Sequence, residues 1–170
     1  MRTDDYFDLE IETMKPGDLR VLQQAKLATQ LDYLYSRSAF YRDKFAAAGI
    51  RREDYRDLND LARFPFTIKE ELRESQQAFP PLGSHMAADM KDVIRLHAST
   101  GTTGRPSFVG LTRKDAEMWT KVTARSFYTQ GIRPSDIVIH ATSLTMFAGG
   151  LPSKDAIELM VSLYDASHAA

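Results

Sequence analysis

The chain has 170 residues, which suits one ordinary domain and is too short for two large ones. Its 22 Lys and Arg nearly balance 23 Asp and Glu, so we expect no broad electrostatic surface for nucleic acid or an acidic membrane. Cysteine is absent, which excludes disulfides, a thiolate nucleophile and a zinc–thiolate site.

Residues 1–80 are expected to form an N-terminal helical segment. Leucines recur at helical spacing from Asp18 to about Tyr35, and a second helix is predicted over 39–48, where Gly49 would end it. The run from Thr67 to Glu70 has the pattern of a capping box at the start of a third helix. The acidic N-terminus lacks the apolar stretch of a signal peptide, and no apolar run is long enough to span a bilayer. We therefore expect a cytoplasmic protein without membrane contact.

Residues 81–170 have the residue pattern of an α/β segment. The expected elements, in order, are a strand over 93–98, a strand over 107–112, a helix from Thr112 to about 130, a buried strand over 136–142 and a helix from Pro152 onward. This order predicts the start of a mostly parallel sheet with flanking helices. So short a sheet leaves part of its helical cover unsupplied. We therefore expect both segments, 1–80 and 81–170, to belong to one larger and here incomplete domain.

The loop between the first two expected strands is the most informative stretch. It is rich in hydroxyl side chains and glycine, and a guanidinium and Pro106 follow at once. Its members are Ser99, Thr100, Gly101, Thr102, Thr103, Gly104 and Arg105. Glycines let backbone N–H groups converge on an anion, hydroxyls add donors, and arginine adds a charged fork. The spacing fits neither G-x-x-x-x-G-K-[ST] nor G-x-G-x-x-G. A phosphate-binding loop and an ordinary Ser/Thr/Gly hairpin turn both remain open on composition.

The segment from Ser99 to Pro106 resembles the phosphate-binding loop of the adenylate-forming acyl-CoA synthetase superfamily, written [ST]-[ST]-G-[ST]-T-G-[KR]-P. Three further stretches resemble its phenylacetate–CoA ligase branch. They are Phe64–Leu72, Arg95–Ser99 and Phe147–Leu151. The helices around Ser38–Arg42 fit that branch too, so the resemblance covers nearly the whole chain.

The resemblance implies an AMP-forming acid–CoA ligase. In such enzymes a carboxylate attacks the α-phosphate of MgATP, pyrophosphate leaves, and the thiol of coenzyme A then displaces AMP from the acyl-adenylate. The loop Ser99–Arg105 would embrace the β- and γ-phosphates of ATP. Family members are more than twice as long, and their adenine-binding motif, magnesium-binding glutamate and C-terminal lysine domain would lie past Ala170. The resemblance thus implies an N-terminal portion, inactive alone, with no catalytic residue assigned within it.

The acid substrate is expected to be a small aromatic carboxylic acid. By resemblance, the substrate pocket includes Phe147, Ala148 and Gly149. Aromatic residues that phenylacetate-type members carry just before this stretch are replaced by Thr142 and Leu144, so the identity of the acid stays open.

The remaining chemical side chains favour structural roles. The four histidines have no i, i+3 or i, i+4 partner, so no metal site is predicted. His97 either supports the loop from its strand or contacts ligand, and His140 either faces the acyl pocket or is a satisfied strand residue. Trp119 is expected in the core rather than stacked on a cofactor.

Two rival hypotheses come from other classes. The chain could be a non-catalytic domain that keeps the loop to bind ATP or to associate with a separate chain, or a remnant without a stable fold. Uncovered apolar sheet faces predict a homodimer or association with a remaining chain.

Overall fold

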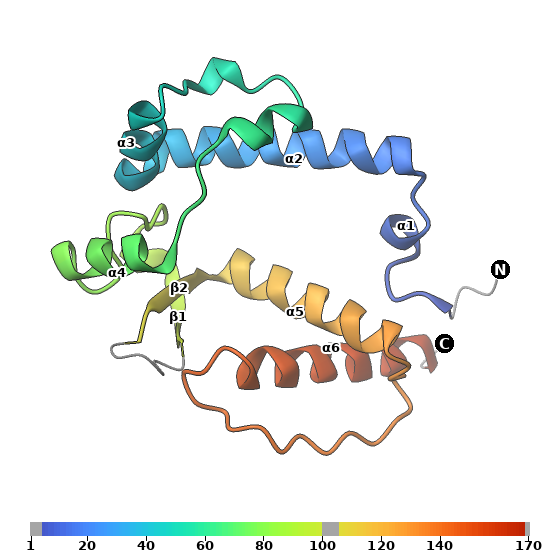
Figure 1. Ribbon diagram of the computed structural model, residues 1–170. Coiled ribbons are helices and arrows are strands. Elements are labelled where there is room, and N and C mark those ends of the chain that lie inside the picture. Colours follow the sequence, from blue (N-terminus) through green and yellow to red (C-terminus); the bar gives the residue numbers. More distant parts are fainter. Residues whose placement is uncertain (1–4, 100–105, 169–170) are drawn as a thin grey trace. The chain divides into compact units, whose positions relative to one another are not determined.

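The computed structural model describes residues 5–99 and 106–168 (Figure 1). The chain divides into two compact units, Met14–Asp92 and a second that combines Met1–Thr13 with Val93–Ala170. The mixed helix-and-strand class is confirmed, whereas membership of segments 1–80 and 81–170 in one larger domain stays a prediction. None of the described helices is long and apolar enough to cross a membrane.

The unit Met14–Asp92 is helical. Its elements are α2 (Pro16–Arg37), α3 (Ala39–Ala47), the 3-10 helices η2 (Arg52–Asp54) and η3 (Leu58–Arg63), α4 (Lys69–Ala78) and the 3-10 helix η4 (Met90–Asp92). Pro16 sits in the first turn of α2, where its missing N–H costs no hydrogen bond. Gly49 has φ +69° just after α3, as its predicted role as a helix stop requires.

The predicted capping box of α4 is displaced by one residue. The helix begins at Lys69 with Ile68 as the N-cap, and the carboxylate of Glu71, not Glu70, accepts the N–H of Ile68 at 2.8 Å. Glu71 also pairs with Lys44 on α3. The hydrogen bond from Lys44 and the one from the backbone of Ile68 both favour the charged carboxylate, so they lower the pKa of Glu71.

An aromatic core holds α2 and α3 together. Its buried residues are Leu31, Phe45, Ile50 and Tyr55, and Leu27, Ala28, Tyr35, Tyr41 and Phe64 pack around them. The ring of Phe45 lies 5.3 Å from that of Tyr35 and 5.2 Å, edge-on, from that of Phe64. The hydroxyl of Tyr35 donates to the carbonyl of Ile50 at 3.2 Å, so its polar tip is satisfied.

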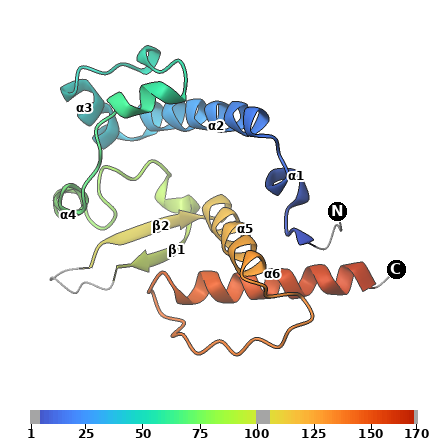
Figure 2. The ribbon, with the colours of Figure 1, turned by 45° about the vertical axis from the view of Figure 1, so that its right-hand side comes forward.

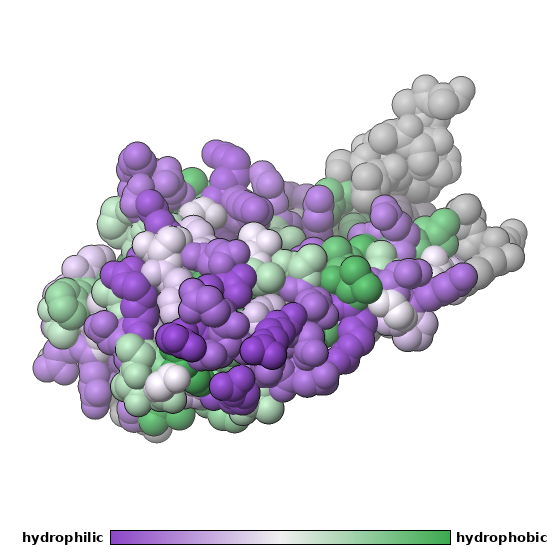
Figure 3. Space-filling model, turned by 90° about the horizontal axis from the view of Figure 1, so that it is seen from above, coloured by the Kyte–Doolittle hydropathy of each residue, from purple (hydrophilic) through white to green (hydrophobic). Residues whose placement is uncertain are grey.

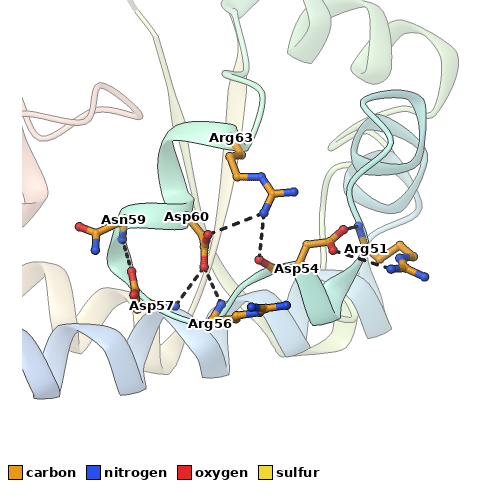
Figure 4. Close-up of polar contacts among 7 residues, drawn as sticks. All are labelled: Arg51, Asp54, Arg56, Asp57, Asn59, Asp60 and Arg63. Carbon is orange, nitrogen blue, oxygen red and sulfur yellow. Dashed lines mark hydrogen bonds and ion pairs between the residues drawn. The ribbon is translucent and has the colours of Figure 1, made fainter.

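Carboxylates organise the two 3-10 turns that follow α3 (Figure 4). Asp60 accepts the backbone N–H groups of Arg56 at 2.9 Å and Asp57 at 3.2 Å. These hydrogen bonds lower the pKa of Asp60, because they favour its charged form. Arg63 lies 3.7 Å from the same carboxylate. Short-range polar contacts thus fix turns that have few apolar residues.

A polar cluster joins α3 and α4 to the chain that follows α4; we define it as Ser38, Ser75, Ser84 and His85. The hydroxyl of Ser75 accepts the N–H of Ser84 at 2.9 Å and lies 3.0 Å from Nδ1 of His85. The buried hydroxyl of Ser38 is 3.3 Å from the carbonyl oxygens of both Ser84 and His85, so its one hydrogen is shared between two acceptors. Burial lowers the pKa of His85.

The second unit contains two strands and two long helices (Figures 1 and 2). Its elements are α1 (Leu9–Glu12), β1 (Val93–Ala98), β2 (Phe108–Thr112), α5 (Arg113–Thr129) and α6 (Gly150–His168). Thr112 caps α5 as predicted: it accepts the N–H of Asp115 at 3.3 Å, and Asp115 accepts the N–H of Thr112 at 2.9 Å.

Helices α5 and α6 pack together around buried residues Ala124, Ala156 and Met160. Both alanines are fully covered, which permits a close approach of the two helix backbones. The N-terminal turn joins this core, since Phe7 packs on Tyr128 and Asp8 pairs with Arg125 at 3.1 Å. Helix α6 begins at Gly150, two residues before the predicted start at Pro152.

The predicted sheet arrangement is wrong for the described strands. Strands β1 and β2 pair antiparallel in a two-stranded sheet, and the parallel contact found among the described residues is an isolated bridge between Ala98 and Phe147. The short loop between the strands allows only this hairpin, because a parallel pair needs a long crossover.

The strand predicted over 136–142 does not form. Ile137 and Ile139 are 95% and 89% exposed in an open connection between α5 and α6, which Figures 1 and 2 show as a loop that leaves the helix pair. A strand needs a neighbouring strand to bond its backbone, and the described residues pair none with it. Figure 3 shows apolar residues among the polar ones of one face.

Candidate functional site

The base of the predicted phosphate loop is closed by two hydrogen bonds. The N–H of Ser99 donates to the carbonyl of Ser107 at 2.9 Å, and the N–H of Ser107 donates to the hydroxyl of Ser99 at 3.0 Å. Of the predicted phosphate-binding residues, Ser99 is thus a loop-closing residue, with its hydroxyl engaged by the backbone. The other members, Thr100–Arg105, lie outside the described residues.

The predicted acyl segment, Phe147–Gly149, lies against the end of β1. The N–H of Ala98 donates to the carbonyl of Met146 at 2.8 Å, and Ala98 forms its bridge with Phe147. The residues that precede the phosphate loop and the acyl segment are therefore hydrogen-bonded, although 48 positions separate Ala98 from Met146. The structure thus places the residue before the loop beside the start of the predicted acyl segment.

Two glycines allow the tight path from the acyl segment into α6. A Cβ on Gly149 would lie 2.6 Å from the ring of Phe147, and a Cβ on Gly150 would lie 2.0 Å from the carbonyl oxygen of Ser143. A side chain at Gly150 would clash with the backbone, whereas one at Gly149 would require the ring of Phe147 to move. The hydroxyl of Ser153 donates to the carbonyl of Gly149 at 2.7 Å and fixes the first turn of α6. Gly150 thus has a steric reason to be glycine.

His97 stands at the centre of this arrangement. Its side chain is 1% exposed, its Nδ1 lies 3.1 Å from the carbonyl oxygen of Met146, and its ring lies 5.4 Å from that of Trp119 on α5. The interpretation of His97 as a strand residue that supports the loop fits these contacts. Trp119 packs on protein, in line with its expected structural role.

An ion pair missed by the sequence analysis attaches β1 to α6. Arg95 and Asp155 are 2.7 Å apart and both are about three-quarters buried. The available signal was a charged residue within a mostly apolar strand, but its partner lies 60 positions away and no local pattern points to it. The ion pair connects β1 to α6, and the carbonyl of Met146 connects β1 to the acyl segment. Neither was among the site residues predicted from the sequence.

Other clefts occur among the described residues, and the first of them includes the Arg95–Asp155 ion pair. A cleft of about 330 Å³ lies where α5, α6 and β1 meet, lined by Arg95, Thr120 and Asp155 among others. A second, of about 350 Å³, lies on α2 beside Arg52 and Tyr55. No predicted site residue lines either of them. Within residues 5–99 and 106–168, no group of three or more His, Asp or Glu could hold a metal ion.

Comparison with curated proteins gives consistent relatives. The chain is 40% identical over 141 residues to a phenylacetate–coenzyme A ligase of Escherichia coli and 41% identical over 145 residues to one of Aromatoleum evansii. The matches cover 83% and 85% of this chain. The chain is homologous to phenylacetate–coenzyme A ligases. It spans 31% and 32% of the length of these two relatives, and no family model matches it.

The solved structures agree on the fold. A 2-hydroxyisobutyryl-CoA ligase in complex with 2-HIB-AMP and CoA, in the thioesterification state, superimposes with a TM-score of 0.86 at 30% identity. The match covers 94% of this chain and 34% of that one. An open conformation of the same ligase gives a TM-score of 0.85 at 28% identity. The resemblance to adenylate-forming ligases deduced from the loop motif is thus confirmed.

Proposed function

We propose that this chain is the phosphate-binding part of an AMP-forming acid–CoA ligase. The overall reaction has two steps. An oxygen of an aryl or other carboxylate bonds to the α-phosphorus of MgATP as the bond to pyrophosphate breaks. The sulfur of coenzyme A then bonds to the acyl carbon as AMP leaves. Magnesium enters with the nucleotide as part of the substrate.

The observation that carries the proposal is a hydrogen bond between the residues that lead into the two predicted sites. Ala98, the residue before the loop, is bonded to Met146, the residue before the acyl segment. A reaction between a nucleotide phosphate and a carboxylate requires its two binding sites to be adjacent. Homology to ligases supports the same chemistry. For Thr100–Arg105 we propose the phosphate contacts, and for Phe147, Ala148 and Gly149 the acid contacts.

Acyl transfer by residues 1–170 alone is not part of the proposal. The relatives are about three times as long, and stabilisation of a transition state by preorganised groups is a large share of catalysis. We propose that these residues bind MgATP and the acid, and that adenylation and thioester formation need the groups of a complete ligase.

A melt with and without MgATP tests this function. Specific binding to the folded state must raise the Tm by mass action. We expect a rise in the wild type and a smaller one in T102A, T103A and R105A. The matched control is R113A, which removes an exposed arginine at the start of α5 and should leave the rise unchanged. Equal losses in R105A and R113A would refute the loop assignment.

A non-catalytic association role is the second candidate, favoured by the exposure of Ile137 and Ile139. Apolar side chains so open to water favour contact with another surface. Analytical ultracentrifugation separates the candidates: concentration-dependent association that I137S/I139S abolishes, together with no MgATP effect on Tm, would favour association over ligand binding.

A further inference from the structure

The buried imidazole of His97 links strand β1 to the segment that leads into the predicted acyl site. Its Nδ1 lies 3.1 Å from the carbonyl oxygen of Met146, and the N–H of Ala98 donates to the same oxygen at 2.8 Å. One carbonyl therefore receives two donors from adjacent residues of β1.

The contact fixes the tautomer of the ring. A carbonyl oxygen only accepts, so Nδ1 must carry the proton, and Nε2 of the neutral ring is left as an acceptor. Nε2 is buried and has no hydrogen-bond partner among the described residues. Phenylalanine would fill similar space without leaving a buried nitrogen unpaired, which carries a cost. The histidine is therefore explained by what Nδ1 does rather than by packing.

The donor at Nδ1 acts at a particular place in the chain. His97 is two residues before Ser99, which closes the predicted phosphate loop, and Met146 directly precedes Phe147 of the predicted acyl segment. The ring also packs on Trp119, which limits its rotation. We propose that His97 is a positioning residue that ties the acyl segment to the end of β1 and so couples binding of the acid to binding of the nucleotide.

The tie at Met146 is tested first without any ligand. Amide hydrogen exchange is measured at Ala98 and Phe147 in the wild type, H97Q and H97N. The amide of Asn reaches about where Nδ1 lies and can still donate to Met146, whereas the amide of Gln lies nearer the position of Nε2. We expect exchange at Ala98 and Phe147 to accelerate about tenfold in H97Q, as loss of one hydrogen bond implies, and to stay near wild type in H97N.

Exchange at Ala124, buried between α5 and α6, serves as the internal control. An equal acceleration at Ala124 would mean that the substitution loosens the whole unit, which overturns a specific tie. Equal acceleration in H97N and H97Q would overturn the role of Nδ1, and so would unchanged exchange in H97Q. W119F alters the packing of the ring but keeps the hydrogen bond, and should leave Ala98 and Phe147 unchanged.

The coupling is tested with MgATP and phenylacetate as probes, and this arm rests on the proposed function. Calorimetry gives the Kd of each probe with and without the other. In the wild type, we expect each probe to lower the Kd of the other about five- to tenfold. In H97Q each should still bind alone, with a coupling factor near one, and H97N should restore it.

The two arms separate the possible failures. A wild type that binds neither probe contradicts the proposed function in this chain and removes the coupling, while exchange at Ala98 and Phe147 still decides the positioning tie. A wild type that binds both probes without mutual effect, or an H97Q variant with full coupling, overturns the proposal while leaving the ligase function intact.

Discussion

Two regions of the molecule differ in how far they bury their apolar side chains. The helical unit Met14–Asp92 buries its aromatic residues against each other and caps its turns with nearby carboxylates. The connection over 136–149, which belongs to the second unit, instead leaves Ile137 and Ile139 exposed to water and contacts strand β1 through Met146 and Phe147. The contrast lies in burial: the helical unit covers its aromatic residues with one another, whereas the connection leaves two isoleucines uncovered.

The largest expected loss of stability comes from removing a ring from the aromatic core of the helical unit. F45A removes a buried ring in contact with Tyr35 and Phe64, and should lower the free energy of unfolding by about 3–5 kcal/mol. Urea unfolding followed by circular dichroism measures the loss. The control is F66A, since Phe66 is 92% exposed, and it should change stability by less than about 0.5 kcal/mol. Similar losses in both variants would show that the core is not where the structure puts it.

Two glycines of the helical unit, Gly83 and Gly49, should differ in how much stability is lost when each is replaced by alanine. Gly83 has φ +80°, and a Cβ there would lie 2.6 Å from the hydroxyl of Ser75 and 2.5 Å from Nδ1 of His85. G83A should therefore disrupt the polar cluster as well as strain the backbone. Gly49 has φ +69° with nothing within 4 Å, so G49A carries only the backbone strain of about 1–2 kcal/mol.

The measurement is the difference between the two variants in urea unfolding. We expect G83A to be the more destabilising, because a methyl group cannot be accommodated at Gly83 unless Ser75 or His85 moves. A larger loss in G49A than in G83A would contradict the cluster.

The polar cluster also predicts a pH dependence. Burial lowers the pKa of His85 below its ordinary value of 6.5, so the unfolded chain takes up a proton at a higher pH than the folded one. The stability that neutral His85 contributes is fully present above about pH 6.5 and is lost as pH falls from there through the lowered pKa. H85N keeps a polar group near Ser75 but cannot titrate, so its stability should fall less than that of the wild type between pH 7 and about pH 5. Parallel curves for the two proteins would contradict the shift.

Local signals account for what the sequence predicted well. Thr112 and Asp115 are three residues apart, so their mutual capping needs nothing beyond that turn. The displaced box at Glu71 shows the limit of such reasoning, because Glu71 also pairs with Lys44, which lies 27 positions away and outside any local pattern. Of the candidate site, the adjacency of Ala98 and Met146 was beyond prediction for the same reason. Its loop motif was recognisable because all its residues are consecutive.

The smallest change in stability is expected in the exposed connection between α5 and α6. Ile137 and Ile139 are almost wholly exposed, so I137S/I139S removes no buried surface from the described unit. The free energy of unfolding should change by less than about 0.5 kcal/mol, while association of the chain at high concentration should decrease. Urea unfolding and sedimentation velocity measure the two quantities on the same samples. A large loss of stability would mean that these side chains are buried in solution, and that the strand predicted over 136–142 forms after all.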